Sequence, residues 1–335
     1  MMNVPRGEHI SACLVRFALP IAAAVAISLI GASISCAQTY PSKPIKIVIP
    51  LTAGSPVDAM ARLIAPALSA RLGQPVIVEN RPGGGGVIGT REVARAAPDG
   101  YTLLYVGLNH VFAPSTYKTV DYDPVKDFAP VGTVGTVSWV VVVPPSLPVT
   151  SVQELVAYAR AHPGKLNWGF GVGTGPHLFG EMFMAATGID VARISYKGGP
   201  QVIPDMLGGR IHLNFGVTAN FLPLIQDGKL RALAVTSENR DRDLPDVPTM
   251  TESGFPRLTR GAWSGLLAPA ATPSSIVNRL NAEINANLAT PEMRASLMKL
   301  GFEPKPGSPA DFVTLLADEI DAWTVAANLA PVMSR

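Results

Sequence analysis

One short stretch, a strand followed by a small glycine-containing loop and a helix, constrains this chain more than any other. Its first part, Ile45–Ile49, is β-branched, largely apolar and ended by proline, which is typical of a buried parallel strand. Ser55 is a suitable N-cap, Pro56 suits the first helical position, and Asp58 stands where a capping-box acid would reach back. We therefore predict a helix that continues over residues 59–72.

The opening turn of this helix is a candidate anion site, because its backbone N–H groups lack partners inside the helix and carry partial positive charge. Taken alone, such a stretch is more often an ordinary capped βα turn. A second copy favours the anion interpretation: a predicted strand over residues 166–171, a glycine-rich loop with Thr174 and Pro176, and a helix that runs through Ala186. Two such tips on one chain predict a site for a carboxylate or phosphate.

A glycine-rich stretch after the second predicted strand raises a different interpretation. Gly84, Gly86 and Gly89 satisfy G-x-G-x-x-G, and a helix is predicted over residues 90–97. A dinucleotide site would need this pattern after the first strand, and a strand ending in an acid about twenty residues further on. Both are missing, so we interpret the glycines as a tight turn that lets helix and strand approach closely, and we predict no cofactor.

Composition and length limit the possible classes of protein. The chain has 335 residues, of which 47% are hydrophobic and 16% charged, with a formal net charge of +2. This suits one large or two medium α/β domains and argues against a nucleic-acid partner. The long apolar stretch 131–143 suits a single strand that runs from one lobe into another, and 263–269 suits the returning strand.

The N-terminus has the features of a secretory signal peptide, residues 1–37. A positively charged front precedes the apolar stretch 17–31, and small residues follow it. Both cysteines, Cys13 and Cys36, lie in this segment, so a cut after it leaves no cysteine. The alternative is a lipoprotein that begins at Cys36. Either outcome predicts a protein that acts in the periplasm.

Catalytic and metal-binding patterns are not found in the sequence. It contains no G-x-S-x-G, H-E-x-x-H, P-loop or C-x-x-C motif, and its five histidines have no metal-ligand spacing. We therefore predict a binding protein and no enzyme, metal or catalytic residue. Asn109 follows the strand predicted over residues 101–106, so it is a candidate polar contact. Trp168 and Phe170 would give an aromatic floor, although core packing is the better interpretation for them.

Several stretches together resemble one family, the periplasmic solute-binding proteins of tripartite tricarboxylate transporters, known as TctC or Bug. They cover the chain from about Tyr40 to Trp323 and include residues 49–62, 78–86, 97–103, 173–178, 196–198, 228–235, 244–249 and 280–283. The resemblance implies an α/β, two-lobed periplasmic-binding-protein fold, type II-like, with a hinge between the lobes. We expect lobe 1 to comprise residues 38–138 plus 252–335, and lobe 2 residues 139–251.

The resemblance also implies that the lobes hold one carboxylate between their first loops, largely through backbone N–H groups. The corresponding residues of this chain are Ala53, Gly54, Ser55, Asp58, Gly173, Thr174 and Gly175. The family usually has two glycines where Ser55 and Pro56 stand, and often serine at Gly175. We predict that Asn109, Tyr196 and Thr218 orient the far end of the ligand.

The function implied is capture of a small organic acid anion, a di- or tricarboxylate or an aromatic acid. The expected partners are the membrane permease subunits of a tripartite tricarboxylate transporter, with the binding protein acting as a monomer. A sensor subunit that presents its ligand to a membrane signalling system would use the same site. A secreted enzyme acting on a carboxylate is a further alternative, and would need a nucleophile, base or metal in the cleft.

Overall fold

The computed structural model describes residues 40–116, 120–172, 174–196 and 198–329. The predicted signal peptide, with Cys13 and Cys36, and the loop residue Gly173 lie outside the described residues. Both α/β lobes belong to one compact unit that begins at Lys43. In the part of the chain that is described, no helix is long and apolar enough to cross a membrane.

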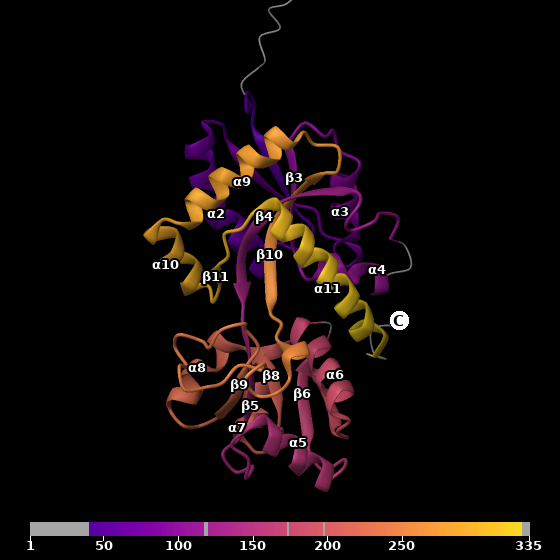
Figure 1. The fold of residues 1–335 in the computed structure, drawn as a ribbon, viewed down its shortest axis with the longest axis vertical. Helices are drawn as coiled ribbons and strands as arrows, with labels where there is room; N and C mark the ends of the chain where they lie inside the picture. The colour runs from indigo at the N-terminus through magenta and orange to yellow at the C-terminus, as the bar shows by residue number, and fades with distance from the viewer. Residues whose placement is uncertain (1–39, 117–119, 173, 197, 330–335) are drawn as a thin grey trace, which may run out of the picture. The chain divides into compact units, whose positions relative to one another are not determined.

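The first lobe is built on a six-stranded mixed sheet with the order β11-β4-β10-β3-β1-β2 (Figure 1). Its strands are β1 (Ile45–Ile49), β2 (Val76–Asn80), β3 (Thr102–Gly107), β4 (Phe128–Val137), β10 (Ala262–Pro269) and β11 (Glu303–Pro304). Its helices are α2 (Pro56–Leu72), η2 (Gly84–Gly86), α3 (Val87–Ala94), α4 (Asn109–Thr116), α9 (Ser274–Leu288), α10 (Pro291–Lys299) and α11 (Pro309–Leu329). β1 pairs in parallel with β2 and β3, as its apolar sequence predicts, and Ile47 and Val48 are fully buried.

The second lobe contains a three-stranded sheet, β8-β5-β9, and a parallel pair of strands, β6-β7. A parallel bridge between Trp168 of β6 and Leu213, the residue before β8, joins the pair to the sheet. Its strands are β5 (Trp139–Val143), β6 (Asn167–Gly171), β7 (Ala192–Tyr196), β8 (Asn214–Val217) and β9 (Arg231–Val235). Its helices are α5 (Val152–Ala161), α6 (Gly175–Thr187), η3 (Gly199–Val202), α7 (Ile203–Leu207) and α8 (Thr218–Gln226), and η4 (Pro256–Leu258) lies on the path back to the first lobe. The two parallel βα units, β1–α2 and β6–α6, therefore fall in different lobes.

The hinge differs from the single long strand expected over residues 131–143. The strand is broken at Ser138, where β4 ends and β5 begins. The Ser138 carbonyl accepts hydrogen bonds from the N–H and hydroxyl of Thr218, at 3.2 and 3.1 Å, instead of joining either ladder. Trp139 then pairs with Thr236 in the second lobe. The chain thus changes sheets at one residue, whereas the exact lobe boundaries stay a prediction.

The glycine-rich turn after β2 behaves as predicted, but its helix begins earlier. α3 starts at Val87 and not at residue 90, because Gly86 adopts a left-handed conformation (φ 107°) directly before it. A β-carbon at Gly89 would lie 2.7 Å from the Arg81 carbonyl oxygen and 3.0 Å from the Pro50 α-carbon. Only glycine allows this approach of helix and strand, which accounts for the motif without a dinucleotide.

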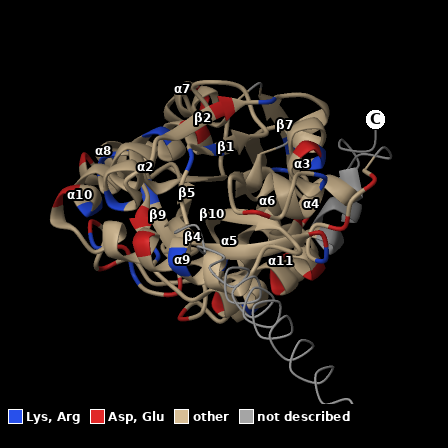
Figure 2. Cartoon of the chain, turned by 90° about the horizontal axis from the view of Figure 1, so that it is seen from above, with Lys and Arg blue, Asp and Glu red and all other residues tan. Residues whose placement is uncertain are grey.

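Helix α11 links the two lobes. It spans Pro309–Leu329 and packs on β4 and α4 in the first lobe and on α6 in the second. Figure 1 shows it running beside β10 and α4. Charged residues of both signs alternate along the outer helices and loops (Figure 2). The central strands carry few of them in that view.

Candidate anion-binding site

The tip of α2 is capped as the sequence predicts. Ser55 is the N-cap, with φ −67° and ψ 156°, and its hydroxyl accepts a hydrogen bond from the Asp58 N–H at 3.3 Å. The Asp58 carboxylate accepts a hydrogen bond from the Gly54 N–H at 2.8 Å. A capping box would use the N–H of the N-cap, Ser55, which is the next residue along the chain. Gly54 has φ 82°, a left-handed conformation that favours glycine. The loop from Ala53 to Gly54 is exposed.

The carboxylate of Asp58 belongs to the protein framework. It is only 3% exposed, and it also accepts hydrogen bonds from Arg62 Nε at 3.0 Å and Asn80 Nδ2 at 2.9 Å. Burial raises the pKa of Asp58, but the hydrogen bonds from Gly54, Asn80 and Arg62 outweigh it and hold the pKa below its ordinary value. Asp58 is predicted either to cap α2 or to contact the ligand, and these bonds fit a residue that caps the helix and orders its loop. The tip of α2 therefore already holds a negative charge.

The tip of α6 follows the same sequence plan without an acid. Thr174 is the N-cap, with φ −89° and ψ 159°, and its hydroxyl donates to the Gly171 carbonyl at 2.8 Å and accepts from the His177 N–H at 3.4 Å. The first turn of α6 contains no Asp or Glu. Among the described residues, no hydrogen bond uses the Gly175 N–H. This tip therefore keeps a donor for an anion.

His177, in the first turn of α6, is fully buried. Its ring stacks on Phe170 at 4.3 Å with an interplanar angle of 4°. Burial lowers the pKa of His177, while the nearby Glu181 opposes the shift. Trp168 and Phe170 pack against this ring and belong to the core, which confirms core packing over an aromatic cleft floor.

The two lobes meet beside the carboxyl end of β3. A β-carbon at Gly175 of α6 would lie 3.0 Å from Leu108 Cδ1 of the first lobe and 2.8 Å from Trp139 Cζ2 of the hinge. A β-carbon at Gly107 would lie 3.3 Å from Val57 Cγ2 in the first turn of α2. Leu108 and Gly107 are consecutive, so both helix tips lie next to the same strand end. This closeness could not be predicted from sequence alone.

Asn109 stands directly after this strand end. A β-carbon at Gly86 would lie 2.7 Å from Asn109 Nδ2, and one at Gly107 would lie 3.8 Å from Asn109 Oδ1. The side chain is half-buried, and within the described residues it makes no hydrogen bond. Its amide is therefore available to a ligand that reaches the α6 tip.

Tyr196 and Thr218 differ from Asn109, because their hydroxyls already have protein partners. The Tyr196 hydroxyl donates to Asp205 Oδ2 at 2.7 Å, and burial, with the neighbouring Asp205 carboxylate, raises the pKa of Tyr196 to about 12. The Thr218 hydroxyl donates to Ser138. Thr218 also lines a hollow of about 420 Å³ at the hinge, together with Arg260. Contact of either hydroxyl with ligand stays a prediction.

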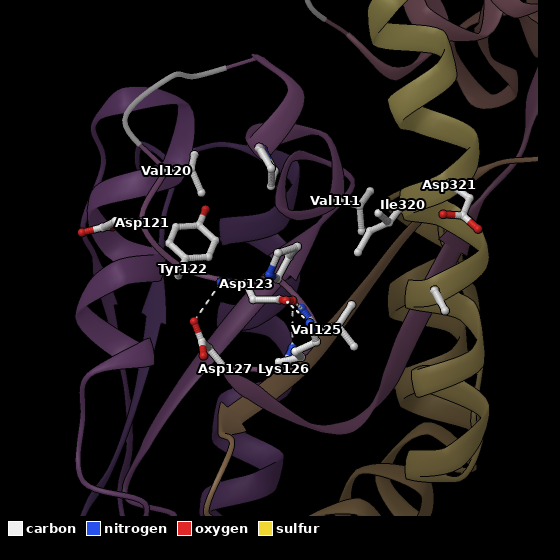
Figure 3. Close-up of a pocket in the computed structure, with 13 residues that line it drawn as sticks. Val111, Val120, Asp121, Tyr122, Asp123, Val125, Lys126, Asp127, Ile320 and Asp321 are labelled. Atoms are coloured by element: carbon white, nitrogen blue, oxygen red, sulfur yellow. Dashed lines mark hydrogen bonds and ion pairs between the residues drawn. The ribbon is translucent and has the colours of Figure 1, made fainter.

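A larger hollow of about 810 Å³ lies away from these residues (Figure 3). It is lined by α4, α11 and the loop before β4, and none of the predicted contacts lines it. Its aspartates organise the loop: Asp123 accepts from the Val125 and Lys126 N–H groups at 2.9 and 3.0 Å. In the described part of the chain, no cluster of His, Cys, Asp or Glu suits a metal ion.

Sequence reasoning missed three neighbours of the site. Asn80 ends β2, so the rule that strand ends line the crevice would have found it, and Arg62 lies one helical turn after Asp58. Trp139 had no local signal, because its contact with Gly175 joins residues of different elements.

Two α/β lobes joined at a hinge, with a helix tip from each beside the crossing, define a periplasmic solute-binding protein. The family model described as "Tripartite tricarboxylate transporter family receptor", TctC, matches residues 60–328. The chain belongs to this family.

Three relatives illustrate the match. BugT of Bordetella pertussis is 37% identical over 302 residues, which cover 89% of this chain and 92% of BugT. The structure of R. palustris Rpa4515 with adipate has a TM-score of 0.68 at 36% identity, over 87% of this chain and 98% of that one. MatC from Rhodopseudomonas palustris with bound malate has a TM-score of 0.66 at 30% identity, over 86% and 100%.

Proposed function

We propose that this protein captures a small organic dicarboxylate between its lobes and delivers it to the permease of a tripartite tricarboxylate transporter. One carboxylate of the ligand binds at the tip of α6, where it accepts a hydrogen bond from the Gly175 N–H. Asn109, first predicted to orient the far end of the ligand, donates its amide to this same carboxylate, because it follows the strand end that the α6 tip meets. The first loop, with Ala53, Gly54 and Ser55, covers it from the other lobe. The ligand leaves unchanged, since binding needs only donors and a closing hinge.

The observation that carries this proposal is the meeting of the α6 tip with the end of β3. Gly175 and Leu108 come from different lobes, and Asn109 presents an unused amide beside them. A site made from both lobes is complete only when they approach, so ligand binding favours the closed form. The adipate and malate held by Rpa4515 and MatC support a dicarboxylate in this chain too.

Calorimetry on the purified protein, freed of bound ligand by unfolding and refolding, tests the proposal. The titrants are succinate, malate, adipate, citrate and benzoate. We expect one or more of the dicarboxylates to bind at micromolar Kd, and benzoate to bind weakly, because its ring has no second anionic group. Heat from none of the five acids, with the protein shown to be folded by circular dichroism, would contradict the proposal.

We further propose that the protein is exported by its signal peptide, residues 1–37, and acts in the periplasm as a monomer. Intact-mass measurement of the natively processed protein distinguishes a cut after residue 37 from a lipid-bearing Cys36. Co-purification with the permease from membranes, with and without the bound acid, tests delivery. The proposed lobes are residues 38–138 with 252–335, and residues 139–251.

A further inference from the structure

A buried carboxylate joins the hinge to the last helix. Glu319 of α11 is 5% exposed, and one of its oxygens accepts a hydrogen bond from Arg260 at 2.7 Å. The other oxygen accepts the indole N–H of Trp263, at 3.4 Å, and that of Trp323. Trp263 lies in β10, on the return crossing between the lobes, and Trp323 lies one turn after Glu319. One side chain therefore fixes two tryptophans and an arginine around the hinge.

This cluster continues to the anion site through Trp139. The Trp323 ring packs edge-on against Trp139 at 6.1 Å and 72°. Trp139 is the first residue of β5, and it packs in turn against Phe179 of α6 at 5.6 Å. Its Cζ2 and Cη2 atoms lie 2.8 and 3.1 Å from where a β-carbon of Gly175 would be. The position of the Trp139 ring thus determines where the tip of α6 sits.

A carboxylate is a costly residue at this place, so packing alone does not explain it. Burial disfavours a charged carboxylate, and an apolar side chain of similar volume would often stabilise such a position as well or better. What the carboxylate adds is direction: it requires both indole N–H groups to point at it, which fixes the ring planes. Of the two rings, that of Trp323 meets Trp139 and, through it, Gly175.

We propose that Glu319 is a positioning residue for ligand binding, which acts through Trp323 and Trp139 to set the tip of α6 against the end of β3. The expected effect of Glu319 on affinity rests on the proposed function. The expected effect of Glu319 on the tryptophan rings at the hinge does not depend on any ligand. The carboxylate does not contact the bound acid.

The test compares Glu319→Gln with Asp318→Asn, a matched loss of one carboxylate at an exposed residue of the same helix. Both are made in a Trp168→Phe background, because the three remaining tryptophans then all belong to the cluster. In the ligand-free protein we expect Glu319→Gln to shift the tryptophan emission and Asp318→Asn to leave it unchanged. Affinity for whichever panel acid binds should fall about tenfold in Glu319→Gln only, the size typical of a residue acting through neighbours.

Two further variants keep the proposal testable if Glu319→Gln does not fold. Trp323→Phe keeps an aromatic side chain but replaces the indole and removes its N–H, and it should weaken binding. Arg260→Gln removes the cation but no tryptophan, so it should both shift the emission and weaken binding. A melting temperature that falls while emission and Kd stay at their wild-type values would assign Glu319 to stability alone and overturn the proposal. If the wild-type protein binds none of the acids, the proposed function fails, and unchanged ligand-free emission in Glu319→Gln still overturns the positioning role.

Discussion

The tips of α2 and α6 share one sequence plan, yet they differ in what occupies them. Each has a hydroxyl N-cap and a proline in the first turn, with Ser55 as the cap of α2 and Thr174 as the cap of α6. At α2 the buried carboxylate of Asp58 accepts a hydrogen bond from the Gly54 N–H of the loop, whereas α6 has no acid in its first turn. The comparison teaches that an acidic side chain of the protein can itself occupy a helix N-terminus. A capped βα turn therefore predicts an anion site only where the first turn of the helix contains no such acid.

The largest expected effect is at the occupied tip. Asp58→Ala removes the shared acceptor of Gly54, Arg62 and Asn80, which together order the loop before α2. We expect the free energy of unfolding to fall by about 3 kcal/mol, because three hydrogen bonds to one carboxylate are lost and each contributes about 1.5–3 kcal/mol before solvent screening at the half-exposed Arg62 reduces it. Urea unfolding measures it, with exposed Asp318→Asn as control. A loss below about 0.5 kcal/mol would show that Asp58 does not order this tip.

At the open tip, the expected effect is on affinity. Gly175→Ala would place a β-carbon 2.8 Å from Trp139 and 3.0 Å from Leu108, so the α6 tip must move away from the end of β3. We expect Kd for the preferred dicarboxylate to rise by about a hundredfold, as small displacements of a positioned group often cost this much. Calorimetry measures Kd.

A second substitution at Trp139 serves as the control for Gly175→Ala. Trp139→Phe removes the two ring atoms that the new methyl would meet, so Gly175→Ala with Trp139→Phe should recover part of the affinity. No loss in Gly175→Ala alone would mean that this contact is not part of the ligand site.

Asn109 should matter less than Gly175, because it supplies one neutral hydrogen bond. We expect Asn109→Ala to weaken binding by about tenfold, the typical worth of one such bond with its unpaired ligand oxygen. Asn278→Ala, at an exposed residue of α9, is the matched control and should bind as the wild type does. Equal affinities of the two variants in calorimetry would remove Asn109 from the site.

The parts of this comparison that the sequence predicted are the local ones. The strand Ile45–Ile49, the caps Ser55 and Thr174 and the first-turn prolines depend on residues within one helical turn, and the structure confirms them. The two-lobed fold came from the resemblance to a family, which the match over residues 60–328 bears out.

Other features depend on partners far along the chain, and so they could not be read from the sequence. The break at Ser138 depends on Thr218, eighty residues later. The carboxylate at the α2 tip accepts a hydrogen bond from Asn80, which lies on β2. The contact between Gly175 and Leu108 depends on how the lobes meet. The spacing of residues within a single helix or strand does not predict contacts between residues of different elements.

The two caps allow a finer comparison. Ser55→Ala and Thr174→Ala each remove one side-chain acceptor from a helix N-terminus, and each should lower the free energy of unfolding by about 1 kcal/mol. Their effects on affinity should differ, because the first turn of α6 carries no acid, whereas the Asp58 carboxylate at the α2 tip repels an anionic ligand. We expect Kd to rise severalfold in Thr174→Ala and to stay near the wild-type value in Ser55→Ala. Equal effects on Kd would mean that both tips hold the anion alike.

The smallest expected effect is a difference in pH dependence between the two tips. Asp58 has a lowered pKa, so its contribution to stability is present above its ordinary value of 3.8 and is lost as the pH falls through the folded-state pKa. His177 in the first turn of α6 is a buried base with a lowered pKa, chiefly through burial. The unfolded chain therefore binds its proton more readily, and stability falls as the pH drops below 6.5, the ordinary pKa of histidine.

Urea unfolding of His177→Gln and Asp58→Asn from pH 3 to 8 separates these two windows. Relative to the wild type, His177→Gln should flatten the stability curve between its folded-state pKa and pH 6.5, because the glutamine takes up no proton. Asp58→Asn should flatten the curve only below about pH 4, near the ordinary pKa of an aspartate. Asn278→Ala, at an exposed residue of α9 that has no titratable side chain, is the control and should leave the curve unchanged. A His177→Gln curve parallel to the wild type at every pH would show that the imidazole titrates alike in the folded and unfolded chains, and that α6 begins with a ring open to water.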